Sequence, residues 1–335
     1  MARGVRRDLT ERLEECFLQR MCAVTASQSD AHRLREALRA GSVMSPFPQL
    51  YTLPNLWSTI NRYQQELYIV RSLASKHPDW IFADVSAAIV HGLWVSYPLL
   101  NAVHIVTSPH AHSRSSRYVS RHQIACLDTE VVDGVRVTSL ERTCFDCLRR
   151  LSFRQSLPIA DSTLRVSGKD IGHFIEAFDS FHRSAHNHGR ASGIMSFANN
   201  LSESGGESLA RAAMIEQGYM LPTLQVEVPN MVDYGASYYV DFCWYLSSGT
   251  IYGEMDGREK YTNPEMTHGR DSVDVLADER LRESRISING VKILRFGYRD
   301  VTRVSRFRYL LDVFGVPSGY AVPDVARTDN PLNKD

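Results

Sequence analysis

The stretch that decides the fold of the C-terminal part of this chain is residues 238–261, YYVDFCWYLSSGTIYGEMDGREKY. Its residues alternate with period two on both sides of Ser247-Ser248, a pattern typical of half-buried β-strands. We predict two antiparallel strands joined by a tight turn at Ser247-Ser248. Such a turn pairs residues whose numbers sum to 495, which places Asp241 opposite Glu254. The alternation assigns one face of the first strand to Val240, Phe242, Trp244 and Leu246.

The other face of this predicted hairpin is rich in acidic residues. Carboxylates that face each other across a ladder repel, so the face must be open to water or hold a divalent cation. Hard oxygen ligands of this kind suit Mg²⁺ or Mn²⁺. We predict Asp241, Glu254 and Asp256 as metal ligands, with Lys260 as the cation that positions or deprotonates a water for phosphodiester cleavage. The alternative interpretation is an acidic hairpin on the protein surface.

The composition indicates a globular protein with several domains. The chain has 335 residues, of which 43% are hydrophobic, and its formal net charge is zero. The total charge therefore does not indicate a nucleic-acid partner. Residues 292–308 nevertheless contain six basic residues and one acidic residue. Such a patch can follow a phosphate backbone, although a solvated helix face has a similar composition.

The cysteine pattern and the hydropathy predict a cytoplasmic protein. Six cysteines spread over the chain do not form a disulfide framework. Cys144 and Cys147 lie within a helical pattern, and we interpret them as core packing. There is no apolar run of transmembrane length, and the basic start MARGVRR is not followed by the apolar segment of a secretory signal.

The N-terminal residues 1–55 have the pattern of a winged-helix-like segment. An apolar stripe in residues 8–22 predicts one helix, and AHRLREALRAG, with Asp30 as its N-cap, predicts a second. The proline-containing residues 42–55 predict an extended, wing-like pair of peripheral strands. In this arrangement Arg33, Arg35 and Arg39 would lie on an exposed face of the second helix and contact DNA. A small helical domain with ordinary surface arginines would show the same pattern.

The remaining chain predicts a mixed, multidomain α/β protein. Residues 56–200 read as a middle α/β domain. Residues 201–317 read as helix, three strands, helix, strand and helix, with Glu207 in the first turn of the first helix. The last segment, residues 318–335, has no periodicity and is predicted to be disordered.

Several short motifs in this order resemble known families. GGESLARAAMIEQGYM, YVDFCW, GEMDGREKY, DERLRES and VKILRFGYRDV resemble the very-short-patch-repair-like domain of the PD-(D/E)XK, restriction-endonuclease-like superfamily, of the type found in actinobacterial proteins. This similarity covers about residues 200 to 315. Upstream, HRLREALRAG, AAIVHGL and VTSLERTCFDCLRRL resemble abortive-infection type IV antitoxin-like regulators.

The resemblance implies a restriction-endonuclease-like αβββαβ domain. Carried over by position, Glu207, Asp241 and Glu254 would be the acidic residues of its metal site. The family has a lysine two positions after the acid that matches Glu254, where this chain has Asp256, so Lys260 is either a displaced functional lysine or a structural one. The resemblance implies a Mg²⁺-dependent DNA endonuclease. The alternative is an antitoxin-type transcriptional regulator that keeps the nuclease fold without activity. DNA is the partner in both cases, and a cognate toxin would be a second partner of the regulator.

Overall fold

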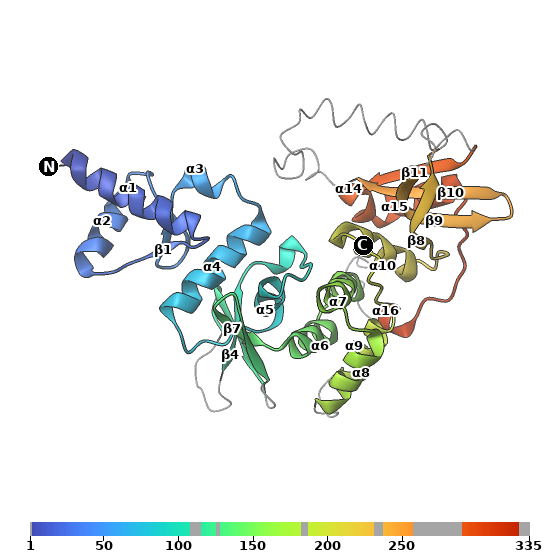
Figure 1. The fold of residues 1–335 in the computed structure, drawn as a ribbon, viewed down its shortest axis with the longest axis horizontal. Coiled ribbons are helices and arrows are strands. Elements are labelled where there is room, and N and C mark those ends of the chain that lie inside the picture. Colours follow the sequence, from blue (N-terminus) through green and yellow to red (C-terminus); the bar gives the residue numbers. More distant parts are fainter. Residues whose placement is uncertain are drawn as a thin grey trace. The chain divides into compact units, whose positions relative to one another are not determined.

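The computed structural model describes residues 2–107, 115–124, 128–181, 187–230, 237–256 and 290–327 (Figure 1). The chain divides into two compact units. The first comprises Met1–Arg149 with Phe174–His188, and the second comprises Arg150–His173 with Gly189–Asp335. Helices and several small sheets are mixed along the chain, so the fold is mixed α/β as predicted. Within the described ranges, no helix is long and apolar enough to cross a lipid bilayer.

The N-terminal part of the first unit is a small helical layer on a three-stranded sheet. The sheet order is β1-β3-β2 with antiparallel pairs, so β3 is its middle strand. The prediction that both extended segments would be peripheral is therefore wrong for β3, because this strand buries all three of its residues. The elements of this part are α1 (Ala2–Leu18), β1 (Ala23–Val24), α2 (Gln28–Arg39), β2 (Met44–Phe47) and β3 (Leu50–Thr52).

Helix α2 begins three residues before the predicted start. Its N-cap is Ser27, whose hydroxyl oxygen accepts the backbone N–H of Asp30 at 3.2 Å. Asp30, the predicted cap, lies in the first turn instead, where it accepts the backbone N–H of Ala26 at 2.8 Å and pairs with Arg12 at 2.7 Å. Serine and aspartate are about equally good caps, and an acid three residues after the cap can reach back to it. The sequence pattern therefore could not separate these two positions.

The rest of the first unit builds two strand pairs against helices. Strands β4 and β5 pair in parallel, and β6 pairs with β7 through a turn at Asp133-Gly134. Phe82 bridges both pairs through Ile105 and Val137. The elements are α3 (Pro54–Trp57), α4 (Arg62–Lys76), α5 (Asp84–Val90), the 3-10 helix η1 (Tyr97–Leu99), β4 (Val103–Thr107), β5 (Val119–Gln123), β6 (Thr129–Val132), β7 (Val135–Thr138), α6 (Leu140–Arg150) and α8 (Ile171–Ser180).

Cys144 and Cys147 lie on α6 and are fully buried, which confirms their prediction as core residues. Neither of them is part of a disulfide. Because α6 buries seven consecutive residues, it is a central helix of the unit and not a surface element.

The second unit contains a four-stranded sheet in the order β11-β10-β9-β8. Strands β8, β9 and β10 form an antiparallel meander, and β11 adds in parallel beside β10. The predicted helix at residues 271–288 falls outside the described residues. The elements are α7 (Phe153–Ser167), α9 (His188–Met195), α10 (Gly205–Glu216), β8 (Thr223–Pro229), β9 (Ser237–Leu246), β10 (Gly249–Asp256), β11 (Lys292–Gly297), α14 (Tyr298–Val301), α15 (Val304–Phe314) and α16 (Asp324–Arg327).

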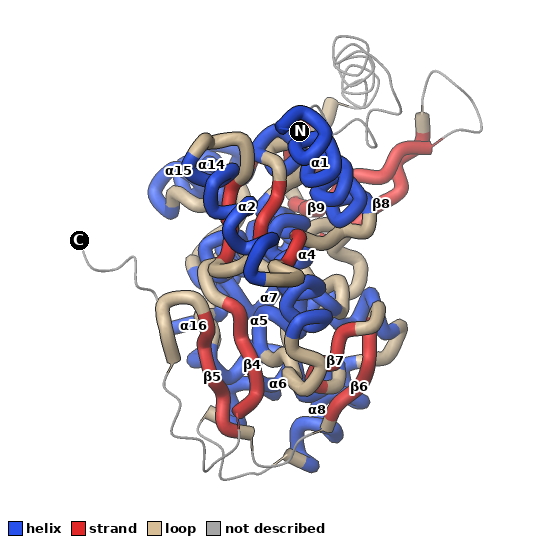
Figure 2. The backbone as a smooth tube through the Cα atoms, turned by 90° about the vertical axis from the view of Figure 1, so that its left-hand side faces the viewer, coloured by secondary structure: helices blue, strands red, loops and turns tan. Residues whose placement is uncertain are grey.

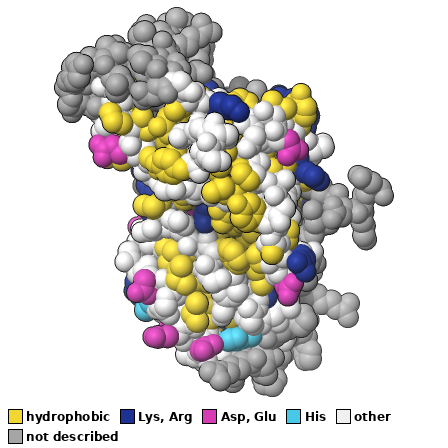
Figure 3. Space-filling model, turned by 90° about the vertical axis from the view of Figure 1, so that its right-hand side faces the viewer, with side chains coloured by type: hydrophobic (Ala, Val, Ile, Leu, Met, Phe, Trp, Pro, Cys, Tyr) yellow, Lys and Arg dark blue, Asp and Glu magenta, His cyan; other side chains and the backbone are white. Residues whose placement is uncertain are grey.

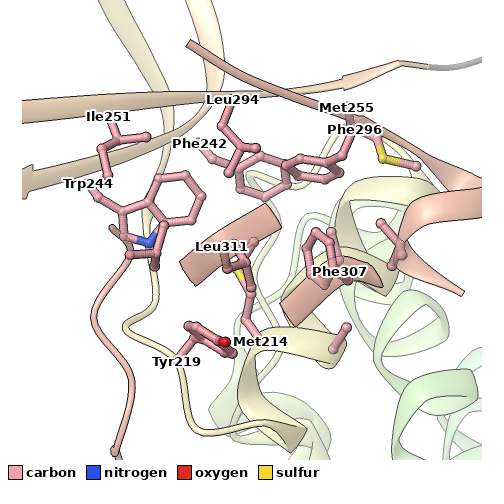
Figure 4. Packing of buried hydrophobic residues seen from close by; sticks show 14 of the residues in the cluster. Met214, Tyr219, Phe242, Trp244, Ile251, Met255, Leu294, Phe296, Phe307 and Leu311 are labelled. Carbon is pink, nitrogen blue, oxygen red and sulfur yellow. The ribbon is translucent and has the colours of Figure 1, made fainter. Parts of the chain in front are cut away.

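One face of this sheet packs on α10 and α15 (Figure 4). Aromatic rings from the strands and from α15 meet there, with ring centroids of Phe242 and Phe296 5.7 Å apart and those of Phe296 and Phe307 5.0 Å apart. A Cβ on Gly253 would lie 2.9 Å from atoms of Phe242 and Trp244. Glycine at this position therefore leaves room for the side chains of Phe242 and Trp244 on the core face of the sheet.

Residues 318–327 form backbone hydrogen bonds and a short helix, so the prediction of disorder is wrong for these residues. The backbone N–H of Tyr320 donates to Gly218 O at 3.0 Å, and that of Met220 donates to Pro317 O at 2.8 Å. Helix α16 then buries Ala326. These contacts join residues about a hundred positions apart, and a search for local periodicity does not detect them.

Candidate functional site

The register of the β9–β10 hairpin is the predicted one. Every residue pair of this ladder sums to 495, from Gly249 with Leu246 to Gly253 with Phe242, and the turn consists of Ser247 and Ser248. Burial along β10 also alternates strictly, with Glu254 and Asp256 on the half-buried face. The ladder ends at Gly253 and Phe242, one position before the predicted pairing of Asp241 with Glu254.

The regular pleat of β9 is interrupted at Asp241. In the ladder with β8, Leu224 pairs with Phe242 and Val226 pairs with Val240, but Gln225 and Asp241 between them do not pair. Gln225 has a left-handed backbone with φ of +49°. Val240 packs with Cys243 in a second apolar cluster, whereas Phe242 belongs to the main core. Val240 and Phe242, which the alternation places on one face, therefore pack in different apolar clusters, and the position between them is the one at which the β8–β9 ladder lacks a pair.

Glu207 is held tightly at the start of α10. The helix cap Ser204 accepts the Glu207 N–H at 3.2 Å and donates its hydroxyl to Glu207 Oε1 at 2.7 Å. Glu207 Oε2 accepts the backbone N–H of Glu203 at 2.7 Å and the side-chain amide of Gln225 at 3.3 Å. Burial and the nearby charge of Asp241 raise the pKa of Glu207, against the lowering effect of the Glu203 hydrogen bond. The structure thus brings Glu207, Gln225 and Asp241 together from a helix and two strands.

Asp241 is tied to β10 beside Glu254. Its Oδ2 accepts the backbone N–H of Met255 at 2.7 Å. This contact places the Asp241 side chain within one residue of Glu254 along the neighbouring strand. The convergence of the Asp241 and Glu254 carboxylates themselves stays a prediction.

Asp256 has a cationic partner that sequence analysis missed. Arg295 on β11 pairs with Asp256 through two of its nitrogens, one at 3.3 Å. In the parallel β10–β11 register Arg295 stands directly beside Glu254. The metal-ligand role predicted for Asp256 therefore competes with an ion pair. Lys260 lies outside the described residues.

The predicted DNA-contacting arginines of α2 differ in exposure. Arg35 and Arg39 are exposed, and Arg35 Nε donates to Ala31 O at 2.9 Å. Arg33 is half-buried, which differs from the prediction of three arginines on one exposed face. In the space-filling view of Figure 3, the visible lysine and arginine side chains are scattered among hydrophobic and uncharged ones.

A second group of possible metal ligands was not found by sequence analysis. Asp84, His104 and His122 lie in the first unit, with their ligand atoms all within 4.8 Å of one another. They are about twenty residues apart in the chain and form no recognisable motif. The sequence offers one indication of this cluster, which is His104 within an alternating strand. A histidine in a strand is too common to predict a metal site.

No family model matches this sequence, and no curated protein matches it. The function is therefore inferred from the geometry of the described side chains together with the motifs quoted above.

Proposed function

We propose that the second unit is a metal-dependent endonuclease domain that hydrolyses DNA phosphodiester bonds. The observation that carries this proposal is the proximity of Glu207 and Asp241, at the position where the β8–β9 ladder lacks a pair. There burial, together with the charge of Asp241, raises the pKa of Glu207, and Asp241 Oδ2 accepts the backbone N–H of Met255, the residue after Glu254. A buried carboxylate close to a second acid is destabilising, and such unfavourable arrangements are found most often at functional sites.

The donor set fits a hard divalent cation. Proteins hold Mg²⁺ with one or two carboxylates and leave further positions to water and substrate phosphate. Asp241 and Glu254 would supply these two carboxylates, while Asp256 is engaged by Arg295. A bound Mg²⁺ would polarise the phosphate and lower the pKa of a water.

The protein residues around these carboxylates have separate tasks. Glu207, fixed by hydrogen bonds from Glu203, Ser204 and Gln225, orients the attacking water through its rigid carboxylate. Arg295 places a positive charge beside Glu254 and stabilises the negative charge that develops on the phosphate. Arginine in this position takes the part that a lysine after Glu254 plays in the related nucleases.

Replacing Glu254 with alanine is expected to abolish Mg²⁺-dependent nicking of supercoiled plasmid, because the cation loses a direct ligand. The measurement is gel analysis of plasmid incubated with purified full-length protein and Mg²⁺ or Mn²⁺. Glu227→Ala is a matched control, since Glu227 lies on β8 of the same sheet, is exposed, and bonds Ser237 rather than the acidic site. A wild-type protein that neither nicks DNA nor gains thermal stability from Mg²⁺ would overturn the nuclease proposal.

An antitoxin-type transcriptional regulator is the second candidate function. The observation that favours it is the Asp256–Arg295 ion pair. At the position where the resembling nucleases have a lysine, this chain has an aspartate whose charge Arg295 neutralises. In the first unit, α2 also presents Arg35 and Arg39 to solvent next to a small β-sheet. In this case the acidic residues of the second unit are not needed for DNA binding.

The double variant Arg35→Ala/Arg39→Ala is expected to weaken DNA binding and flatten its salt dependence. Removing one phosphate contact lowers the slope of log K against log salt by about 0.9, so the slope of the double variant falls by up to about two units. Fluorescence anisotropy at several salt concentrations measures this slope. Arg327→Ala is the control, because Arg327 is exposed on α16 and pairs with Asp324. An unchanged slope in the double variant would contradict a DNA-binding role for α2.

A further inference from the structure

We propose that Asp84, His104 and His122 form a binding site for a zinc-class transition-metal ion in the first unit. This site is separate from the acidic residues of the second unit and does not depend on the proposed nuclease function. Two nitrogen donors and one carboxylate converge there, which is a different ligand chemistry from an all-oxygen magnesium site.

Three elements bring the donors together. Asp84 is the first residue of α5, His104 lies on β4, and His122 lies on β5. Strands β4 and β5 run in parallel side by side (Figure 2), with Val106 opposite His122 and His104 opposite Ser120. Because side chains alternate along a strand, His104 and His122 share one face of this pair.

The distances suit one shared ion. His104 Nδ1 lies 2.9 Å from His122 Nε2 and 3.8 Å from Asp84 Oδ1. Donors at zinc–ligand distances of 2.0–2.1 Å in a tetrahedron lie about 3.3 Å apart. The two observed separations lie on either side of this value, so a small adjustment of the side chains would place all three donors around one cation.

The surroundings hold these donors in place. Asp84 adopts a left-handed backbone with φ of +52° while 2% exposed. Its Oδ1 accepts the Val85 N–H at 2.7 Å and lies 3.8 Å from the Cys147 thiol. The backbone N–H of His104 donates to Ser86 Oγ at 2.8 Å. A strained backbone at a buried acid, fixed by neighbouring groups, is common where a side chain must point in one functional direction.

Burial determines the type of metal site. Asp84 and His104 are buried, whereas His122 is half-buried and lies towards solvent. Among the three donors, His122 is therefore the one that is partly accessible to solvent. Three protein ligands leave one tetrahedral position for water or an anionic ligand, as in zinc sites that bind exchangeable ligands.

The test uses the full-length protein, stripped with a chelator and then titrated with Zn²⁺, Co²⁺ or Mg²⁺. We expect one Zn²⁺ per chain by equilibrium dialysis, an increase in Tm with Zn²⁺, and the visible absorption of tetrahedral Co²⁺. Stoichiometric binding should be lost in His122→Ala and in Asp84→Asn. It should remain in His173→Ala, an exposed histidine outside the cluster, and in Glu254→Ala, which alters the acidic site.

Two results would overturn the proposal. One is a wild-type protein that binds neither Zn²⁺ nor Co²⁺, which would leave the cluster as a hydrogen-bonded histidine pair beside an aspartate. The other is stoichiometric binding that persists in a folded His122→Ala variant. The cobalt spectrum of the wild type does not require any variant to fold. Absence of plasmid nicking with retained zinc binding would reject the nuclease proposal and leave the metal site standing.

Discussion

Replacing Arg211 with leucine is expected to lower the free energy of unfolding of the second unit by about 3–5 kcal/mol. Arg211 on α10 pairs with Asp161 on α7 at 2.7 Å, and both side chains are almost completely buried. Arg211 also donates to Phe197 O at 2.8 Å. Leucine would leave the Asp161 carboxylate in an apolar interior without its counter-charge, and burial already raises the pKa of this group. Thermal or urea denaturation measures the change.

Two further variants distinguish the effect of an unpaired buried charge from the effect of losing any arginine in this unit. Arg306→Leu removes an exposed partner of Asp300 in the same unit and should change stability by less than about 1 kcal/mol. Adding Asp161→Asn to Arg211→Leu should recover part of the stability, since asparagine removes the buried charge and keeps an acceptor for the Asn199 N–H. Equal destabilisation by Arg306→Leu and Arg211→Leu would contradict this explanation.

Replacing Glu207 with glutamine is expected to abolish Mg²⁺-dependent nicking while leaving Tm at neutral pH unchanged or higher. Burial and Asp241 raise the pKa of Glu207, so the folded protein holds a proton that the unfolded chain releases at lower pH. The contribution of Glu207 to stability is therefore largest at acidic pH and falls as pH rises from the usual carboxyl range, about 4.3, through the raised pKa. Glutamine keeps the shape of the side chain and removes this penalty.

The measurement is Tm as a function of pH for the wild type and Glu207→Gln, together with plasmid nicking. The difference between the two proteins should shift in favour of Glu207→Gln as pH rises. Glu227→Gln, on the exposed β8 position, should show no such trend. A Glu207→Gln protein that nicks DNA normally would remove Glu207 from the catalytic set. One that loses stability equally at every pH would show that the hydrogen bonds to its carboxylate outweigh the electrostatic penalty.

The sequence by itself determined the local features of the hairpin. Period-two alternation predicted β9 and β10, and the turn residues Ser247-Ser248 predicted the sum-495 register that the structure contains. The same kind of pattern predicted the order of helix and strands around Glu207 and the core position of Cys144. These features depend on neighbours within a few residues, because side-chain direction along a strand or helix follows a fixed period.

Only the tertiary structure decided which distant residues meet. It joined Arg295 to Asp256, Asp84 to two histidines, and the C-terminal segment to Gly218. It also placed Val240 in a different apolar cluster from Phe242, although the alternation predicts one shared face. Such contacts depend on how separate elements pack, and packing is set by the combined burial of many side chains rather than by any local period. A single sequence therefore locates the acids of the candidate site, while the cations and histidines around each site come from the fold.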